Sequence, residues 1–279
     1  MSYQPVIPLG GLAGWRFLQR TEAKQQASFD KSADVSRDAA WFEEKIGGVA
    51  SAADLMADRR LLKVALTAFG LDGEIDKKAF IRKVLEEGTT DPAALASRLT
   101  DKSFAKLSDA FGFGAADGPY TAGAGFAAKI VAAYKARVFE AAVGDADNDM
   151  RLAMNFRREI ADLAGQGEEG ASWYGVLGSK PLRQVFEAAF GLPAAFAQVD
   201  IDRQRDVLAE RTGRLLGGDT LAVFRDPEAV EKLLTRFLAR AQIAAGASTT
   251  TPGAAALTLL RGNGGDPSQG LLNLLASRA

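Results

Sequence analysis

The sequence predicts an all-α fold, a helical bundle built from two divergent copies of a multi-helix unit joined by a long helical segment. Three observations support this prediction. Apolar residues recur at three- and four-residue steps, glycines follow the last periodic residue of several stretches, and no alternating strand pattern of any length occurs. Helical stripes of this kind bury their apolar faces against one another, which indicates helix-on-helix packing.

Composition indicates a globular chain with a sizeable core. Of its 279 residues, 47% are hydrophobic and 25% are charged, which suits one large domain or two small ones. Lysine and arginine number 34 against 35 aspartates and glutamates, so the net charge is −1. Nucleic-acid-binding proteins usually carry a basic excess, so we expect no nucleic-acid partner.

Histidine and cysteine are both absent from the sequence. Their absence excludes disulfides, Ser-His-Asp triads, Cys-His nucleophiles and zinc sites that use histidine. Any catalysis would have to use carboxylates, lysine, tyrosine or serine, and no convincing motif of these residues occurs. We therefore expect no catalytic residues, no metal site and no cofactor.

The N-terminal region, residues 1–50, is expected to form an extended lead and two helices. Prolines and glycines indicate that residues 1–11 are extended, and apolar residues predict a helix from Leu12 to about Asp30. A second helix is expected to follow Ser36 and to stop at Gly47.

No stretch of the sequence has the character of a signal peptide or a membrane span. The start lacks a basic region followed by an unbroken apolar run. The longest charge-free run, Ala241–Leu260, is broken by Pro252 and glycines. We expect the protein in the cytoplasm at synthesis, and export by a route that reads no cleavable signal stays open.

Residues 51–114 are predicted to form the first copy of the unit. Ser51 and Asp54 resemble a capping box, with aspartate in place of the usual glutamate. Three amphipathic stretches follow, at residues 58–71, 75–88 and 89–113. The third is expected to span two short helices. Asp91 precedes a proline and is expected to cap the start of the third stretch.

The first and third stretches end in the same way. Phe69-Gly70-Leu71 closes one, and Phe111-Gly112 closes the other. Glycine after the last periodic residue predicts a left-handed helix stop, and each phenylalanine is expected to be a core residue beside that stop.

Residues 115–171 are expected to form a glycine-rich hinge and connecting helices. Helices are predicted at 126–143 and 150–163, with an interruption between them. The interruption contains aspartates at positions 145, 147 and 149, which is the opening spacing of a calcium loop. Met150 and Phe156 stand where such a loop needs glycine and glutamate, so we interpret the aspartates as a helix start.

Residues 172–245 are predicted to form the second copy. When the sequence is compared with itself at a shift of 121 positions, Phe69-Gly70-Leu71 aligns with Phe190-Gly191-Leu192. At a shift of 123 positions, Val84-Leu85 of the following helix aligns with Val207-Leu208. Asp226-Pro227 is interpreted as the counterpart of Asp91-Pro92. The common order of helix, stop, helix and Asp-Pro favours duplication over chance similarity.

The C-terminal tail, residues 246–279, is low in charge and rich in glycine and threonine. Within it, the segment 270–278 is too short to be a stable free helix. Its leucines are the predicted partner-binding residues, namely Leu271, Leu272, Leu274 and Leu275. Docking on the protein's own body and contact with another molecule both remain open.

Three short patterns resemble functional motifs without their context. Gly123–Ala128 fits the dinucleotide fingerprint but follows no predicted strand. Ser103–Lys106 fits the serine-lysine pattern but lacks its companion motifs. Gly165–Ser172 has P-loop-like glycine spacing without the lysine. We interpret all three as structural.

The ordered set of motifs resembles a bacterial domain-of-unknown-function family encoded among flagellar genes. The stretches that carry the resemblance are GGLAGWRFLQRT at 10–21, WFEEKIGGVASAADLMADRRLLKVALTAFGL at 41–71, KAFIRKVLEEGTTDPAALASRLTDKSFAKLSDAFGF at 78–113, FEAAVGDADNDMRLAMNFRREI at 139–160, WYGVLGSKPLRQVFEAAFGLP at 173–193 and DIDRQRDVLAER at 200–211. The resemblance implies a flagellum-linked role through gene neighbourhood, and it supplies no catalytic residues.

Two functional hypotheses follow from the sequence. The first is a non-enzymatic protein of flagellar assembly, whether structural, an export partner or chaperone-like, with a flagellar component as its protein partner. The alternative is a small-molecule-binding helical domain or an enzyme that uses carboxylates and lysine, which would require a deep pocket with convergent charged groups.

Overall fold

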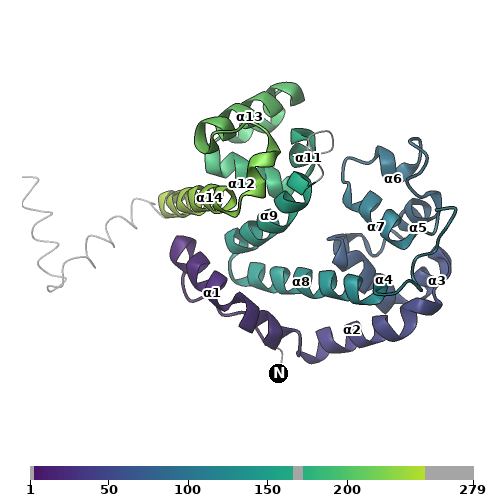
Figure 1. Cartoon of the computed structure of the whole chain (residues 1–279). Coiled ribbons are helices and arrows are strands. Elements are labelled where there is room, and N and C mark those ends of the chain that lie inside the picture. The colour runs from purple at the N-terminus through teal and green to yellow at the C-terminus, as the bar shows by residue number, and fades with distance from the viewer. Residues whose placement is uncertain (1–2, 166–171, 249–279) are drawn as a thin grey trace, which may run out of the picture.

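The computed structural model describes residues 3–165 and 172–248 (Figure 1). These residues form thirteen α-helices, four short 3₁₀ helices and no strands. The predicted all-α class is therefore confirmed for the described part of the chain.

The first half contains a group of helices that precedes the hinge. In order they are α1 (Gly11–Phe29), α2 (Ala33–Lys45), η1 (Ile46–Gly48), α3 (Ala52–Ala57), α4 (Arg59–Ala68), η2 (Asp72–Glu74), α5 (Lys78–Glu87), α6 (Leu95–Arg98) and α7 (Ser103–Phe111). Helices α2 to α7 gather on one side of the molecule, where α2 packs on α4 and α5 packs on α7 (Figure 1).

Two long helices connect this group to the second half. Helix α8 (Phe126–Ala146) packs along α4 and α2, and α9 (Asn148–Gly165) packs back on α8. Figure 1 shows α8 running from the first group of helices towards the second. The predicted long helical connection is therefore present.

The second half contains a comparable group of helices. In order they are α11 (Trp173–Gly178), α12 (Lys180–Phe190), η3 (Ala194–Gln198), α13 (Ile201–Leu216), η4 (Leu221–Arg225) and α14 (Pro227–Ser248). Helix α14 packs on α12 and also on α1 of the first half. One continuous core of buried side chains runs through both groups.

Polar caps start several helices where the sequence predicts them. The Ser51 hydroxyl accepts a hydrogen bond from the Asp54 amide at 3.2 Å, and the Asp54 carboxylate accepts one from the Ala50 amide at the same distance. The Asp147 carboxylate accepts a hydrogen bond from the Asp149 amide at 2.9 Å, just before the first residue of α9. The capping box and the helix-start interpretation of the aspartates are both confirmed.

The predicted start of the second helix is wrong. Helix α2 begins at Ala33, so Ser36 lies inside it, where its amide donates to the Ser32 carbonyl oxygen at 2.9 Å. The stretch 173–192 is split at Ser179 into two helices. The split arises because the Ser179 backbone is extended, with φ of −94° and ψ of 107°.

Asp91 and Asp226 also have different roles. The Asp226 carboxylate accepts a hydrogen bond from the Glu228 amide at 2.9 Å, and α14 starts at Pro227. The Asp91 carboxylate instead accepts a hydrogen bond from the Ala93 amide at 2.8 Å within a turn, and α6 starts only at Leu95. The expectation that Asp91 caps a helix is therefore wrong.

Candidate functional site

The three predicted helix stops have the backbone geometry that glycine favours. Gly70, Gly112 and Gly191 have φ of +76°, +66° and +62°. These values lie in the left-handed region, where a Cβ is disfavoured. The sequence prediction for the Phe-Gly pairs is therefore confirmed at the level of the backbone.

The stops of α4 and α12 share the same hydrogen-bond pattern. The Leu71 amide donates to the Leu66 carbonyl oxygen at 2.9 Å, and the Leu192 amide donates to the Glu187 carbonyl oxygen at 2.8 Å. Each bond spans five residues and satisfies a carbonyl of the last turn, as in a Schellman motif.

The apolar residues of these stops are not equally buried. The side chains of Phe111, Phe190 and Leu71 are buried, with exposures of 0%, 4% and 3%, whereas Phe69 and Leu192 are half-buried. Both rings were expected to be buried, and Phe69 is buried only in part. The Phe69 side chain still packs against the core.

The predicted structural residues do not converge on one site. The Phe111 ring packs edge to face with Phe126 at 5.2 Å between centroids. The Phe190 ring lies 6.0 Å from the Phe186 ring in the second half. The stops therefore lie in different parts of one continuous core.

Truncating the two stop phenylalanines should have unequal effects. Phe190→Ala is expected to lower the free energy of unfolding by about 3 kcal/mol, and Phe69→Ala by about half as much because its ring buries less area. Urea denaturation of both variants measures the difference. Equal losses would show that Phe69 is as well packed as Phe190.

An arginine from a long helix covers each of two stops. A Cβ added at Gly70 would lie 3.2 Å from the guanidinium carbon of Arg137, which belongs to α8. A Cβ added at Gly191 would overlap the guanidinium of Arg240 on α14. The positive φ favours glycine at both stops, whereas the guanidinium groups are the far ends of flexible side chains that can shift.

Arg137 also enters a partly buried ionic network between α8 and α9. Its guanidinium lies 3.1 Å from the Glu159 carboxylate and 3.7 Å from Glu140. Arg158 reaches Glu140 at 2.9 Å and Glu159 at 3.6 Å. The Ser179 hydroxyl donates to Glu159 at 3.1 Å, which connects the network to the start of α12.

The network lowers the pKa values of Glu159 and of Arg137, for different reasons. Burial alone would raise the pKa of Glu159, but the positive charges of Arg137 and Arg158 outweigh it, so the pKa is lowered. Burial and repulsion by Arg158 lower the pKa of the Arg137 guanidinium, against the attraction of the two glutamates. Both partners stay charged at neutral pH, which favours a structural role in joining the helices.

A second buried polar cluster centres on Asp38 of α2. Lys63 lies 2.8 Å from one carboxylate oxygen, and the Tyr134 hydroxyl donates to the same oxygen at 3.2 Å. Arg60 approaches the other oxygen at 3.4 Å. Burial and the nearby Asp38 charge raise the pKa of Tyr134, so its hydroxyl remains a donor that holds α8 against α2.

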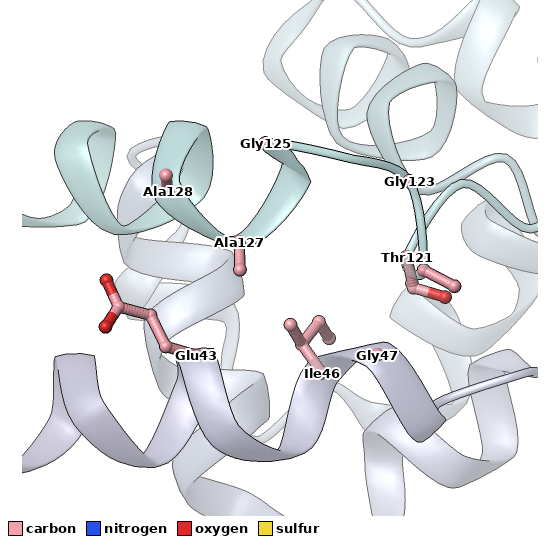
Figure 2. Close-up of a pocket in the computed structure, with 9 residues that line it drawn as sticks. Glu43, Ile46, Gly47, Thr121, Gly123, Gly125, Ala127 and Ala128 are labelled. Carbon is pink, nitrogen blue, oxygen red and sulfur yellow. The ribbon is translucent and has the colours of Figure 1, made fainter.

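A shallow groove runs between α2 and the first half of α8. One hollow of about 340 Å³ is lined by Glu43 and Ile46 on α2, by the loop at 121–125, and by Ala127 and Ala128. Figure 2 shows the Glu43 carboxylate between the two helices, directed towards α8. The lining of α8 consists of small residues, so another backbone could approach it closely.

A second hollow of about 350 Å³ continues the groove towards the end of α1. It shares Glu43 and Ala128 with the first hollow and adds Asp30, Val131 and Lys135 among its lining. We call the two hollows together the α2–α8 groove. Its lining combines small apolar side chains with charged ones, a mixture that a peptide or helix can contact.

The charged residues of the groove have few partners. In the described part of the chain, neither Glu43 nor Lys135 has an ion-pair partner within 4.0 Å. One Asp30 carboxylate oxygen is buried without a hydrogen-bond partner, and burial raises the pKa of this carboxyl against the attraction of Lys135. The groove therefore offers carboxylates to a positively charged ligand group.

Sequence reasoning did not identify this groove. Its residues come from three helical regions and the loop before α8, and the Gly123–Ala128 pattern that lines part of it was interpreted as structural. The available signal was the spacing of Ala128 and Ala132, which are four residues apart and therefore lie on one flank of α8.

The other predicted motifs have structural settings. Lys106 of the serine-lysine pattern lies 3.7 Å from Asp162 and is exposed at the surface with it. Over residues 3–165 and 172–248, no three carboxylates gather closely enough to hold a metal ion. In the same ranges, no helix has both the length and the hydropathy needed to cross a membrane. The predicted partner-binding leucines, Leu271, Leu272, Leu274 and Leu275, lie outside the described residues.

Comparison with solved structures places the fold among known proteins. An X-ray crystal structure of a protein from Agrobacterium tumefaciens matches with a TM-score of 0.72 and 30% sequence identity, covering 86% of this chain and 99% of that chain. Comparison with curated proteins gives no match.

Residues 68–230 match the family described as protein of unknown function, DUF1217. The matched range begins at the end of α4, spans both connecting helices and ends in α14. It covers more than half of the sequence, so this chain belongs to the DUF1217 family.

Proposed function

We propose that this protein is a non-enzymatic interaction protein of flagellar assembly. The observation that carries the interaction role is the α2–α8 groove, which is shallow and open; small residues line most of its first hollow, and charged and polar residues line much of its second. The flagellar assignment rests on the ordered sequence motifs that resemble a family encoded among flagellar genes. The protein acts in the cytoplasm after synthesis or travels with the flagellum as it is assembled.

The charged clusters support a non-enzymatic role. In both of them the carboxylates are held by arginine or lysine side chains from neighbouring helices. A catalytic acid or base needs a perturbed pKa close to the working pH and access to substrate. The lowered pKa of Glu159 instead keeps it charged and engaged with Arg137.

We also infer that the two groups of helices are divergent copies of one unit. Ser51 and Ser172, which are 121 positions apart, both cap a six-residue helix, and Gly70 and Gly191 repeat at the same spacing. Helix α4 packs on the long helix α8, and α12 packs on the long helix α14. An experimental structure in which α3 to α5 fail to superpose on α11 to α13 would contradict this inference.

Deletion of the gene tests the proposed function. We expect the deletion strain to swim poorly or to assemble fewer filaments, and a plasmid-borne wild-type gene to restore both. Soft-agar motility and electron microscopy of filaments provide the measurements. Normal motility together with normal filaments in the deletion strain would refute the flagellar assignment.

A groove variant connects the phenotype to the surface. Ala128→Arg places a long charged side chain on the exposed flank of α8, where it fills the groove without touching the core. Ala195→Arg, at an exposed position of η3, is the matched control. The groove variant should fail to restore motility although it folds normally, and the control should restore it.

A further inference from the structure

We propose that an exposed face of α14, formed by Arg236, Arg240 and Ile243, binds an acidic amphipathic helix of another protein. We call these three residues the α14 face. The proposal rests on the inferred duplication, because α9 packs on the equivalent face of α8 in the first copy. It goes beyond the α2–α8 groove, since it assigns a second interaction surface to the second half of the chain.

Helices α8 and α14 repeat one pattern of burial when they are compared at a shift of 103 positions, from 137 to 240. Three buried side chains of α8 match three of α14, namely Ile130, Val131 and Tyr134 with Leu233, Leu234 and Phe237. In the same register Arg137 matches Arg240, and each arginine lies over the glycine stop of the helix packed beside it. The two long helices therefore present corresponding faces.

In the first copy, α9 covers the face of α8 that carries Arg137. The Glu159 carboxylate of α9 lies 3.1 Å from the Arg137 guanidinium. Glu140, three residues after Arg137, is only 6% exposed and pairs with Arg158 of α9 at 2.9 Å. A neighbouring helix therefore both covers this face and compensates the charge of its arginine.

In the second copy, the corresponding face is open to solvent. Ile243, three residues after Arg240, takes the place of Glu140 and is 71% exposed. Arg236 and Arg240 are exposed as well, and within residues 3–165 and 172–248 no carboxylate lies within 4.0 Å of either guanidinium. The Arg236 guanidinium donates to the Ala189 carbonyl oxygen at 2.7 Å, which holds it at the end of α12.

These properties define the chemistry of the partner. Arg236, Arg240 and Ile243 are spaced by four and three residues, so they lie on one face of α14 within about two turns. A helix with apolar and acidic side chains on one face can cover Ile243 and pair its carboxylates with the two guanidiniums. Such a helix repeats what α9 does for α8.

Another protein is the source of this helix that the sequence and burial favour. The sequence after Ser248 contains one carboxylate side chain, Asp266, whereas the α14 face has two arginines. An anionic membrane is disfavoured, because a helix that lies on a membrane needs a broad apolar face, and the apolar face of α14 is buried in the core.

A pair of synthetic peptides tests the proposal with the full-length protein. The first is a fluorescein-labelled helix of alanine, leucine and glutamate, about 18 residues long, with its leucines and glutamates on one face. The second has glutamine in place of each glutamate. Fluorescence anisotropy should show that the glutamate peptide binds about tenfold more tightly, because hydrogen bonds between charged groups are stronger than neutral ones. Equal affinities would overturn the proposal.

Variants show whether the α14 face is the binding surface. Arg240→Gln removes a guanidinium and Ile243→Asp adds a repelling charge, so each should weaken binding of the glutamate peptide about tenfold. Both side chains are exposed, so Tm should not change. Arg211→Gln, at an exposed position of α13, removes the same charge elsewhere and should leave binding unchanged. An equal loss for Arg211→Gln would indicate non-specific attraction and overturn the proposal.

A photo-crosslinker at position 243 distinguishes the other possible occupants. Benzoylphenylalanine replaces Ile243 in the full-length protein, and mass spectrometry identifies the segment that it captures in cells. We expect a segment of another protein with aspartates or glutamates at helical spacing. Capture of residues 249–279 of the same chain, of a second copy, of lipid or of nucleic acid would overturn the proposal.

The proposals fail by different observations. Peptide binding that depends on Arg240, in a protein whose gene deletion leaves motility normal, would keep this inference and refute the flagellar role. Impaired motility in the deletion strain, together with equal affinities for the two peptides, would keep the flagellar role and refute this inference.

Discussion

Phe186→Ala should cause the largest loss of stability of any single substitution considered for this protein, about 4–5 kcal/mol. The Phe186 side chain is fully buried on α12. Its ring centroid lies 5.4 Å from Phe156, 5.4 Å from Trp173 and 5.7 Å from Phe224, all in edge-to-face geometry. Truncation leaves a cavity and removes these ring contacts, each of which contributes about 0.5–1.5 kcal/mol beyond area burial.

Phe186→Leu is the matched control for this prediction. Leucine keeps most of the buried volume, so the expected loss is about 1–2 kcal/mol. Urea denaturation followed by tryptophan fluorescence measures both variants, since Trp173 contacts the site directly. A loss below about 2 kcal/mol for alanine would mean that the neighbouring rings close the cavity.

Glu159→Gln is expected to lower the free energy of unfolding by about 3 kcal/mol at neutral pH. The substitution removes the charge that compensates Arg137 and Arg158, and breaking one side of a buried ion pair leaves the other side uncompensated. The side chain is 18% exposed, so we expect the low end of the range measured for buried pairs.

The difference between wild type and Glu159→Gln should depend on pH. The pKa of Glu159 is lowered in the folded protein from its ordinary value of 4.5. Above that value the carboxylate is charged in both states and its ion pairs contribute fully. As the pH falls below 4.5, the unfolded chain takes up the proton first, so the contribution shrinks until the pH passes the folded-state pKa.

The control for this prediction is a surface pair of the same chemistry. Arg82 and Glu86 lie 2.6 Å apart on α5, and both are exposed by about half. Glu86→Gln should change stability by no more than about 0.5 kcal/mol. Equal effects of the two substitutions would show that the network at Glu159 is fully screened by solvent.

Local rules in the sequence predicted much of the secondary structure. The stops at Gly70 and Gly191 were predictable because only glycine adopts a left-handed backbone without strain. The caps at Ser51 and Asp147 were predictable because a short polar side chain satisfies free amides of the first turn. The start of α2 at Ala33 was not predicted, and the preceding Ser32 makes no side-chain hydrogen bond to the first turn that would mark it.

The candidate site was less predictable than the fold. Lys135 and Asp30 are about a hundred residues apart, and Glu43 lies on a third helix, so no spacing in the sequence brings them together. The pairing of Glu159 with Arg137 was likewise hidden, since its partner lies on another helix at a distance set by how α8 packs on α9.

The sequence by itself determined the helical class, the glycine stops, and the histidine- and cysteine-based chemistry that the chain lacks. These features follow from residue type and from the periodicity of apolar residues along the chain. Only the tertiary structure decided which apolar residues are fully buried, as the difference between Phe69 and Phe190 shows. It also decided where the charges meet and where a groove stays open. These features depend on the packing angles and distances between helices, which side chains from distant segments set together.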